Sequence, residues 1–463
     1  MRRALTILFG SILLLGPLLF AGPQQATAPQ FPGPIEHVLM VSVDGLMPAS
    51  YTEPDAHGLK VPTMRMLVRE GAYSEGVYPV FPTVTYPTHA SLATGVNPGT
   101  HGIFTNTAFD PLDKNERGWR WYAEDIRVPT LWDVARARGL RTALISWPVT
   151  VGAQADLLVP EFWRASTPED LKLLRALSTR GLLETVASAS SDFYARLQPP
   201  NTKDSALTDI AIHAIETEKP NLMLLHIFQV DHEQHDYGPF SAEADAVIEN
   251  ADAQLARLIE TAKHAGIWER TALVVVSDHG FAPISRSVRP GIWLRKKHLV
   301  EFGPHNKITA WKAAVLPASG SAYIYVKNRN DTETQQSLLR IFQPLAGKRD
   351  SGIRRVITHE QIVGMGGDPS AFLALEAADG FSVVGGYTGK AIEPSTQKGT
   401  HGYFPDRPEM KCSLLIFGPA VGNAKIPNAR VIDIAPTVAR WLGLSLDKAE
   451  GKALDVPIHT PTH

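Results

Sequence analysis

Short apolar runs alternate with longer amphipathic segments along much of the chain. Each run has four to eight residues of nearly continuous apolar character, which is typical of strands buried on both faces of a parallel sheet. The expected strands are His37–Val43, Arg141–Ser146, Asn221–Phe228, Leu273–Ser277 and Ser413–Phe417. The segments with apolar residues at helical spacing are Val61–Glu70, Leu131–Arg138, Ser205–Glu218, Ala242–Ala265 and Ile434–Leu442. This alternation predicts an α/β fold with a mostly parallel central sheet and helices on both faces.

The alternation stops between residues 283 and 396. Short strands are expected there among loops that contain glycine and proline, at Trp293–Leu299, Ala322–Lys327 and Phe381–Gly385. We therefore predict that a smaller α+β subdomain at 283–396 is inserted into a catalytic core, which is formed by residues 35–282 and 397–450. Residues 451–463 are expected to form a tail.

The first 22 residues have the pattern of a secretory signal peptide. Arg2 and Arg3 precede an apolar stretch from Ala4 to Phe20, and the small residues Ala21 and Gly22 follow it. The stretch is at the short end of what can span a bilayer, so an uncleaved anchor is the alternative. Residues 23–34 are rich in Pro, Gln and Ala and are expected to form a flexible spacer. The sequence thus predicts an exported protein, periplasmic or secreted, that contacts a membrane only if the leader is not cleaved.

Composition and charge narrow the class of protein. The chain has 463 residues, of which 44% are hydrophobic, so it can form a large core, and disordered or fibrous classes are excluded. Lys and Arg number 45 against 47 Asp and Glu, and no long basic run occurs, so binding of a nucleic-acid duplex is not expected. The single cysteine, Cys412, has no partner for an internal disulfide.

Side chains of the kinds that bind metal ions occur at four places along the chain. Ligands gather at the carboxyl ends of strands in open α/β sheets, and three of these places follow an apolar run. The side chains are Asp44, then Asp231 and His235 at helical spacing, then the adjacent pair Asp278 and His279, and finally His401 between glycines. Taken alone, Asp44 is also typical of a turn, the 231–236 segment of a solvated loop, and His401 of a structural histidine.

Together these side chains predict more than each does alone. Three carboxylates and three imidazoles divide into two sites of three ligands, fewer than the four that close a structural zinc site. Paired divalent cations stabilise attacking and leaving oxygens in phosphoryl displacement. A hydroxyl-rich segment, Thr83 to Thr88, leads into a short helix whose N-terminus favours anions. A threonine there can act as a nucleophile when a base or metal activates it, and helix capping is its alternative role.

The order of these motifs resembles the type I phosphodiesterase/nucleotide pyrophosphatase family of the alkaline phosphatase superfamily. The resemblance runs from about Val38 to Leu442. Its motifs are a strand followed by Asp, Pro-Thr-x-Thr-aromatic-Pro, Thr-Gly-x-x-Pro-x-x-His-Gly-Ile, Asp-x-x-x-His, Ser-Asp-His-Gly and Gly-x-His-Gly-Tyr. Any one of them is weak, but their combined order is specific. The resemblance implies an alkaline phosphatase-like sheet.

The resemblance also implies a role for each matching residue. It implies two zinc ions per chain, the first held by Asp231, His235 and His401, and the second by Asp44, Asp278, His279 and the nucleophile Thr85. Thr83 is the local competitor for the role of nucleophile. Asn106 is expected to bind a non-bridging phosphoryl oxygen. Tyr86 and Trp147 are expected in the substrate pocket, with a plain wall residue as the alternative for Tyr86.

The implied reaction is hydrolysis of phosphodiester or nucleotide pyrophosphate bonds through a covalent phosphothreonine at Thr85. Superfamily monoesterases often carry a Lys-x-Arg pair that neutralises the extra phosphate charge, and none occurs between Trp147 and Lys172. A small-molecule diester or nucleotide is therefore the expected substrate. The alternatives are a phosphomonoesterase or phosphonate hydrolase of the same superfamily and, from another class, a binding protein that keeps the fold without turnover.

Overall fold

The computed structural model describes residues 30–115, 118–162, 168–198 and 203–459. The predicted signal peptide at 1–22 and most of the predicted spacer at 23–34 lie outside the described residues. Within the described part of the chain, no helix has both the length and the apolar character needed to cross a membrane.

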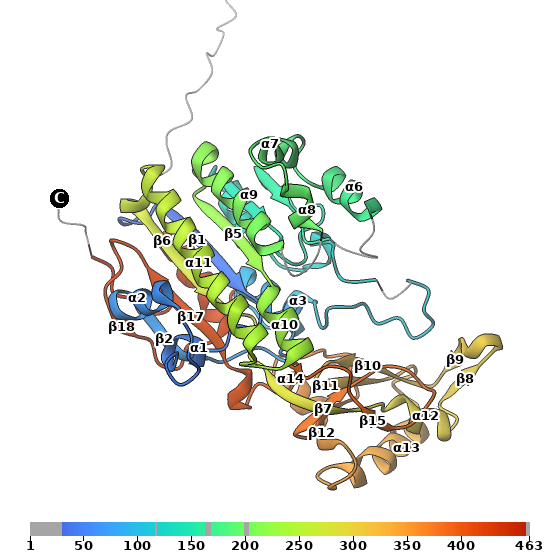
Figure 1. Cartoon of the computed structure of the whole chain (residues 1–463). Helices are drawn as coiled ribbons and strands as arrows, with labels where there is room; N and C mark the ends of the chain where they lie inside the picture. Colours follow the sequence, from blue (N-terminus) through green and yellow to red (C-terminus); the bar gives the residue numbers. More distant parts are fainter. Residues whose placement is uncertain (1–29, 116–117, 163–167, 199–202, 460–463) are drawn as a thin grey trace, which may run out of the picture.

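The largest element of the fold is an eight-stranded sheet with the strand order β18-β2-β17-β6-β1-β5-β3-β4 (Figure 1). Its strands are β1 (His37–Val43), β2 (Ala72–Val77), β3 (Thr142–Ile145), β4 (Leu157–Val159), β5 (Leu222–Ile227), β6 (Thr271–Val276), β17 (Cys412–Phe417) and β18 (Ala424–Lys425). The strands from β6 to β4 in this order are all parallel, whereas β17 is antiparallel to both β6 and β2. The predicted mostly parallel sheet is therefore confirmed.

Helices cover both faces of this sheet, as predicted. The helices on one face are α2 (Pro62–Glu70), α6 (Pro168–Leu177), α7 (Leu182–Ser188), α8 (Phe193–Leu197), α9 (Lys203–Glu218) and α11 (Ala242–His264). Those on the other face are α3 (Thr85–Thr94), α5 (Leu131–Ala137) and α15 (Ile434–Trp441). Leu39 and Val41 of β1 pack on the first face, and Val38 and Met40 pack on the second. Because successive strand residues point to opposite faces, this two-sided burial explains the continuous apolar run of β1.

A second region, from about residue 282 to 400, lies at the end of the large sheet where the site residues gather (yellow to orange in Figure 1). It contains the antiparallel sheet β10-β11-β13-β12, a smaller sheet in which β7 pairs with β14, β15 and β16, and a β8-β9 pair. The strands are β7 (Ala282–Val288), β8 (Val300–Phe302), β9 (Ile308–Trp311), β10 (Ala313–Ala318), β11 (Ser321–Val326), β12 (Ile353–Thr358), β13 (Leu373–Ala377), β14 (Gly380–Val383), β15 (Ile392–Pro394) and β16 (Gly399–Thr400). Its helices are α12 (Gly291–Lys296), α13 (Thr332–Phe342) and α14 (His359–Gly364). The boundaries proposed for the inserted subdomain stay a prediction.

The prediction of a strand at Trp293–Leu299 is wrong, because α12 occupies most of that segment. An apolar run of this length fits one buried helical turn as well as a strand, and periodicity cannot separate the two. The edge-side strand β2 was not predicted, because its sequence includes Ser74 and Glu75 and its burial alternates along the strand. The short helices α1 (Ala49–Thr52) and α4 (Pro98–His101) were also not predicted.

Candidate metal centre

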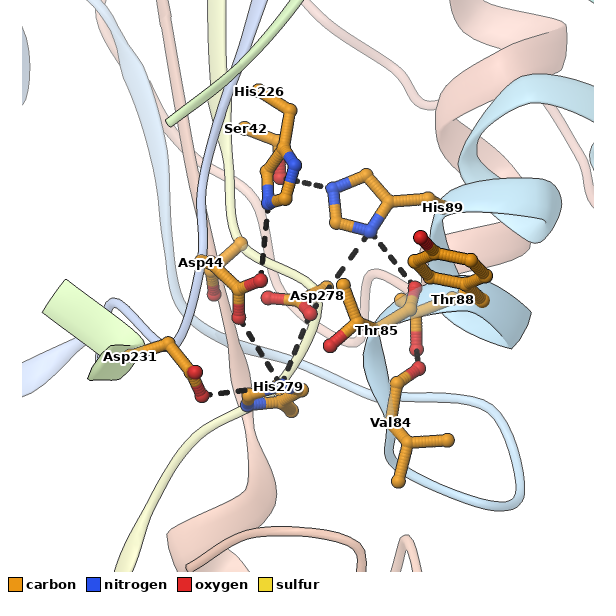
Figure 2. A network of polar contacts seen from close by, with 12 residues as sticks. Ser42, Asp44, Val84, Thr85, Thr88, His89, His226, Asp231, Asp278 and His279 are labelled. Carbon is orange, nitrogen blue, oxygen red and sulfur yellow. Dashed lines mark hydrogen bonds and ion pairs between the residues drawn. The ribbon is translucent and has the colours of Figure 1, made fainter. Parts of the chain in front are cut away.

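Three neighbouring strands bring the predicted ligands together. Asp44 follows β1, Asp278 and His279 follow β6, and Asp231 and His235 lie on α10 (Gln229–Tyr237), which follows β5. Because β6, β1 and β5 are adjacent and parallel, their carboxyl ends meet at the same edge of the sheet. Ligands that are far apart in the sequence therefore converge, as Figure 2 shows for four of them.

The turn after β1 ties these strands to α10. Gly45 has a φ of +69°, and a Cβ atom there would lie 3.3 Å from the Cα of Asp231, so glycine suits both the conformation and the space. Its N–H donates to Oδ1 of Asp278 at 3.1 Å, and its carbonyl accepts a hydrogen bond from the Gln234 side chain at 2.9 Å. This turn fixes Asp278 and α10 relative to Asp44.

The ligand atoms form two clusters. We call Asp231, His235 and His401 the outer cluster, and their ligand atoms all lie within 4.8 Å of one another. We call Asp44, Asp278 and His279 the inner cluster, in which Nε2 of His279 lies 3.2 Å from Oδ1 of Asp44 and 3.0 Å from Oδ2 of Asp278.

Asp231 belongs to both clusters. Oδ1 of Asp231 lies 3.4 Å from Nε2 of His235 and 3.6 Å from Nε2 of His401. The same oxygen lies 3.9 Å from Nε2 of His279, and Asp44, Asp231 and His279 also form a compact group of ligand atoms. The structure therefore brings the six predicted ligands together, with Asp231 between the two predicted groups of three.

All three imidazoles present the same ring nitrogen to these clusters. Nδ1 of His235 lies 3.0 Å from the Gly399 carbonyl, Nδ1 of His401 lies 3.0 Å from the Thr83 carbonyl, and Nδ1 of His279 lies 3.1 Å from the Gly280 carbonyl. A carbonyl only accepts, so each Nδ1 carries a proton, and Nε2 is the nitrogen that can bind a cation when the ring is neutral. Metal-binding histidines are oriented in this way.

The electrostatics of the inner cluster also fit a cation. Burial, together with the charges of Asp278 and Asp231, raises the pKa of Asp44 well above its ordinary value. Among the described residues, Oδ1 of Asp44, Oδ2 of Asp278 and Nε2 of His279 are buried without a hydrogen-bond partner. Leaving such atoms uncompensated is costly. Carboxylate oxygens and imidazole nitrogens are ligands that zinc accepts, so the donor set fits a metal centre.

Thr85 lies beside these clusters, at the first position of α3. It lines a cavity of about 670 Å³, together with Asp44, Asn106 and His401. His89 connects it to the inner cluster, because Nδ1 of His89 lies 2.8 Å from the Thr85 carbonyl and 4.0 Å from Oδ2 of Asp278 (Figure 2). The other candidate, Thr83, is fully buried, and its hydroxyl donates to the carbonyl of Tyr403 at 2.9 Å. Only Thr85 of these two threonines therefore faces the cavity.

Asn106 lines the same cavity, and its orientation is fixed by the start of α3. Its Oδ1 accepts the backbone N–H of Tyr86 at 2.9 Å. With its oxygen used in this way, the amide N–H₂ group of Asn106 is the part that can donate to a ligand.

Tyr86 and Trp147, which were predicted in the substrate pocket, are both completely buried, and neither lines the cavity, so their contact with substrate stays a prediction. The hydroxyl of Tyr86 donates to Glu161 at 3.2 Å, and the Trp147 ring packs edge-on against His89. The aromatic rings that line the cavity are Trp119 and Phe228, both half-buried.

Sequence reasoning missed a second layer behind the ligands. His226 on β5 lies 3.0 Å from Oδ2 of Asp44, and His89 on α3 lies 2.8 Å from both the Thr85 carbonyl and the Ser42 hydroxyl (Figure 2). A histidine inside the apolar run 221–228 was the available signal, because a buried imidazole requires a polar partner.

Candidate metal ligands thus lie beside a hydroxyl at a helix N-terminus, an arrangement that suits a hydrolase. The family model for type I phosphodiesterase/nucleotide pyrophosphatase matches residues 38–404. The chain therefore belongs to this family, as the resemblance in its sequence predicted. The family is typically metal-dependent, and the two groups of Asp and His side chains give this chain candidate ligands.

Curated relatives of known name are distant. The chain is 26% identical over 267 residues to human ectonucleotide pyrophosphatase/phosphodiesterase family member 1. This alignment covers 54% of this chain and 24% of the relative. It is 24% identical over 421 residues to human bis(5'-adenosyl)-triphosphatase ENPP4, which covers 88% of this chain and 78% of the relative. The chain thus spans about a quarter of the first relative and most of the second.

Solved structures share the fold. An inactive variant of murine ectonucleotide pyrophosphatase/phosphodiesterase 5 in complex with AMP superimposes with a TM-score of 0.64 at 21% identity, over 90% of this chain and 97% of that one. The human counterpart gives a TM-score of 0.64 at 19% identity. These likenesses confirm the fold, and the family match makes the chain a nucleotide pyrophosphatase/phosphodiesterase family enzyme.

Proposed function

We propose that this protein is a two-zinc hydrolase of phosphodiester or nucleotide pyrophosphate bonds, acting through a covalent phosphothreonine at Thr85. The observation that carries the proposal is the convergence of six carboxylate and imidazole ligands beside a threonine that lines the cavity. When bound, the ions would supply Lewis-acid stabilisation of the attacking and leaving oxygens.

The chain's own residues would then perform two displacements. In the first, a bond forms between Oγ1 of Thr85 and phosphorus while the bond to the leaving oxygen breaks, and the threonine proton leaves with the departing group or to solvent. In the second, water cleaves the bond between Oγ1 and phosphorus and restores the hydroxyl. The N-terminus of α3 favours the phosphate anion, and the Asn106 amide donates to a non-bridging oxygen.

Two observations support a nucleotide as the substrate. The cavity of about 670 Å³ falls within the range of small-molecule sites. The murine relative is in complex with AMP, and its structure is of an inactive threonine-to-alanine variant, which agrees with a threonine nucleophile in this fold.

Substrate class is tested with p-nitrophenyl-thymidine monophosphate and p-nitrophenyl phosphate on zinc-loaded protein. We expect a higher kcat/KM for the diester. A preference for the monoester would overturn the diester assignment and favour the phosphomonoesterase alternative. Absence of turnover on a panel of diesters, monoesters and phosphonates would favour a binding protein.

The nucleophile is tested by Thr85→Ala. We expect turnover to be abolished while zinc content stays near that of the wild type. Thr88→Ala is the matched control, because this buried threonine lies one turn further along α3 and bonds only the Val84 carbonyl in this structure. Full activity in Thr85→Ala would remove Thr85 from its role.

We also propose that the protein is exported, to the periplasm or to the medium. The pattern of the first 22 residues supports this. N-terminal sequencing of the protein from a secreting host should find the leader removed, and an intact leader in the membrane fraction would favour an uncleaved anchor.

A further inference from the structure

A buried histidine lies directly behind one ligand of the inner cluster. His226 on β5 places Nε2 3.0 Å from Oδ2 of Asp44, and the two residues are 1% and 3% exposed. A carboxylate oxygen accepts, so His226 donates this hydrogen bond. His226 lies on β5, and Asp44 directly follows the neighbouring parallel strand β1, so the contact joins two paired strands at the edge where the site lies.

The other ring nitrogen of His226, Nδ1, also has polar contacts. Nδ1 lies 3.1 Å from the carbonyl of Ser146 and 3.3 Å from Oε2 of Glu161. Ser146 has a φ of +51°, a conformation that costs energy for a residue other than glycine and that persists only where the surroundings require it. Glu161 is 6% exposed and also accepts the hydroxyl of Tyr86. The imidazole therefore lies between Asp44 on one side and the Ser146 carbonyl and Glu161 carboxylate on the other, with its Nδ1 contact to Glu161 an ion pair.

As a result, the two carboxylate oxygens of Asp44 have different partners. Oδ2 is bound by His226, whereas Oδ1 lies 3.2 Å from Nε2 of His279 and has no hydrogen-bond partner among the described residues. We infer that His226 is a positioning residue, which fixes the Asp44 carboxylate so that Oδ1 faces a cation in the inner cluster, while Glu161 and the Ser146 carbonyl orient the imidazole. This inference rests on the proposed metal-dependent function.

If His226 has this role, losing its contacts should weaken cation binding at the inner cluster and not at the outer cluster. The imidazoles of the outer cluster are held by the backbone carbonyls of Gly399 and Thr83, not by His226. Partners behind a metal ligand contribute about 10- to 100-fold to metal affinity because they fix the ligand's orientation. Loss of the His226 contacts should therefore weaken cation binding at the inner cluster selectively.

The test is a zinc titration of the metal-free protein against a competing chelator, which measures the two binding steps without relying on activity. His226→Leu removes both hydrogen bonds and should weaken one step by about 10- to 100-fold. His226→Gln keeps an N–H donor near Asp44 and should recover part of the affinity. Glu161→Gln should give a smaller loss in the same step.

His37→Gln is the matched control. His37 begins the strand that ends before Asp44, is 6% exposed, and pairs its Nδ1 with the Pro220 carbonyl at 2.8 Å. It is a buried histidine of the same sheet, at the opposite end of β1. Both zinc steps should remain at wild-type affinity in this variant.

The outcomes separate this inference from the proposed function. Two wild-type zinc steps with no change in His226→Leu, or an equal loss in both steps, would overturn the positioning role alone. A wild-type chain that binds no divalent cation would overturn the proposed function as well. If His226→Leu does not fold, the titrations of Glu161→Gln and His226→Gln decide the matter, and wild-type affinity in both would overturn the inference.

Discussion

The inner and outer clusters use similar ligands in different surroundings. In the inner cluster the side chains of Asp278 and His279 are fully buried and that of Asp44 is 5% exposed. In the outer cluster the side chains of Asp231 and His235 are 21% and 18% exposed, while that of His401 is 4% exposed. Buried carboxylates need a compensating positive charge, whereas a partly exposed one such as Asp231 can be hydrated. The comparison indicates that a cation bound in the inner cluster would be enclosed by the core, whereas one bound in the outer cluster would be more open to solvent.

The largest expected effect is on kcat/KM, in two single variants that each remove one imidazole, one from the inner cluster and one from the outer cluster. Loss of an inner ligand should cost several kcal/mol of transition-state stabilisation, so His279→Ala should lower kcat/KM by about 1,000-fold or more, at any zinc concentration. His235→Ala should recover in excess zinc, because solvent can fill the vacated position. Steady-state kinetics at low and high zinc measure the difference.

The control for this pair is His264→Ala, an exposed histidine at the end of α11. It should leave kcat/KM unchanged. Equal recovery of His279→Ala and His235→Ala in excess zinc would contradict the distinction between the clusters.

The second-largest expected effect is a loss of stability when the cations are removed. A ligand present at 1,000 times its Kd stabilises the folded state by about 4 kcal/mol per site, so chelation should lower the free energy of unfolding by that order. In metal-free protein, Asp44→Asn should raise the free energy of unfolding, because burial and the neighbouring carboxylates of Asp278 and Asp231 disfavour the charged form of Asp44. Asp231→Asn should change it less, since the Asp231 side chain is partly exposed. Urea unfolding with and without chelator measures both, and a loss of metal-free stability in Asp44→Asn would contradict the argument.

A buried histidine outside both clusters should make the free energy of unfolding depend on pH, and this dependence must be known before the clusters are compared. Burial lowers the pKa of His101 to about 3, whereas an unfolded histidine titrates near 6.5. As the pH falls from about 6.5 to about 3, the unfolded chain takes up this proton first, so the free energy of unfolding decreases, by up to about 1.4 kcal/mol per pH unit. His101→Gln should reduce this slope. Urea unfolding of metal-free protein at several pH values measures it, and an unchanged slope would show that His101 is not responsible.

The smallest expected effect is a loss of stability remote from both clusters. The hydroxyl of Thr130 accepts the backbone N–H of Asp133, and the Asp133 carboxylate accepts the backbone N–H of Thr130, which caps α5 at both positions. Thr130→Ala should cost about 1 kcal/mol in thermal unfolding. Zinc affinity should not change in this variant. A change would mean that zinc binding depends on the overall stability of the protein rather than on the surroundings of each cluster.

The central strands and the convergence of the six candidate ligands could be predicted from the sequence for one physical reason. Strands buried on both faces read as apolar runs, and polar residues such as Asp44 and Asp278 stand out where those runs end. Orientation was harder to predict. The inward direction of Tyr86 depends on Glu161, 75 positions away, and no local pattern records that contact. His226 was overlooked because the apolar run around it indicated only a strand.

The position of Asp231 has a consequence for how the centre fills. One carboxylate oxygen stands between the two places where ions would bind. An ion that arrives first would draw this oxygen toward itself and change the charge that the second ion meets. The two occupancies would then be linked rather than independent, so a cation titration should depart from the curve of two separate sites.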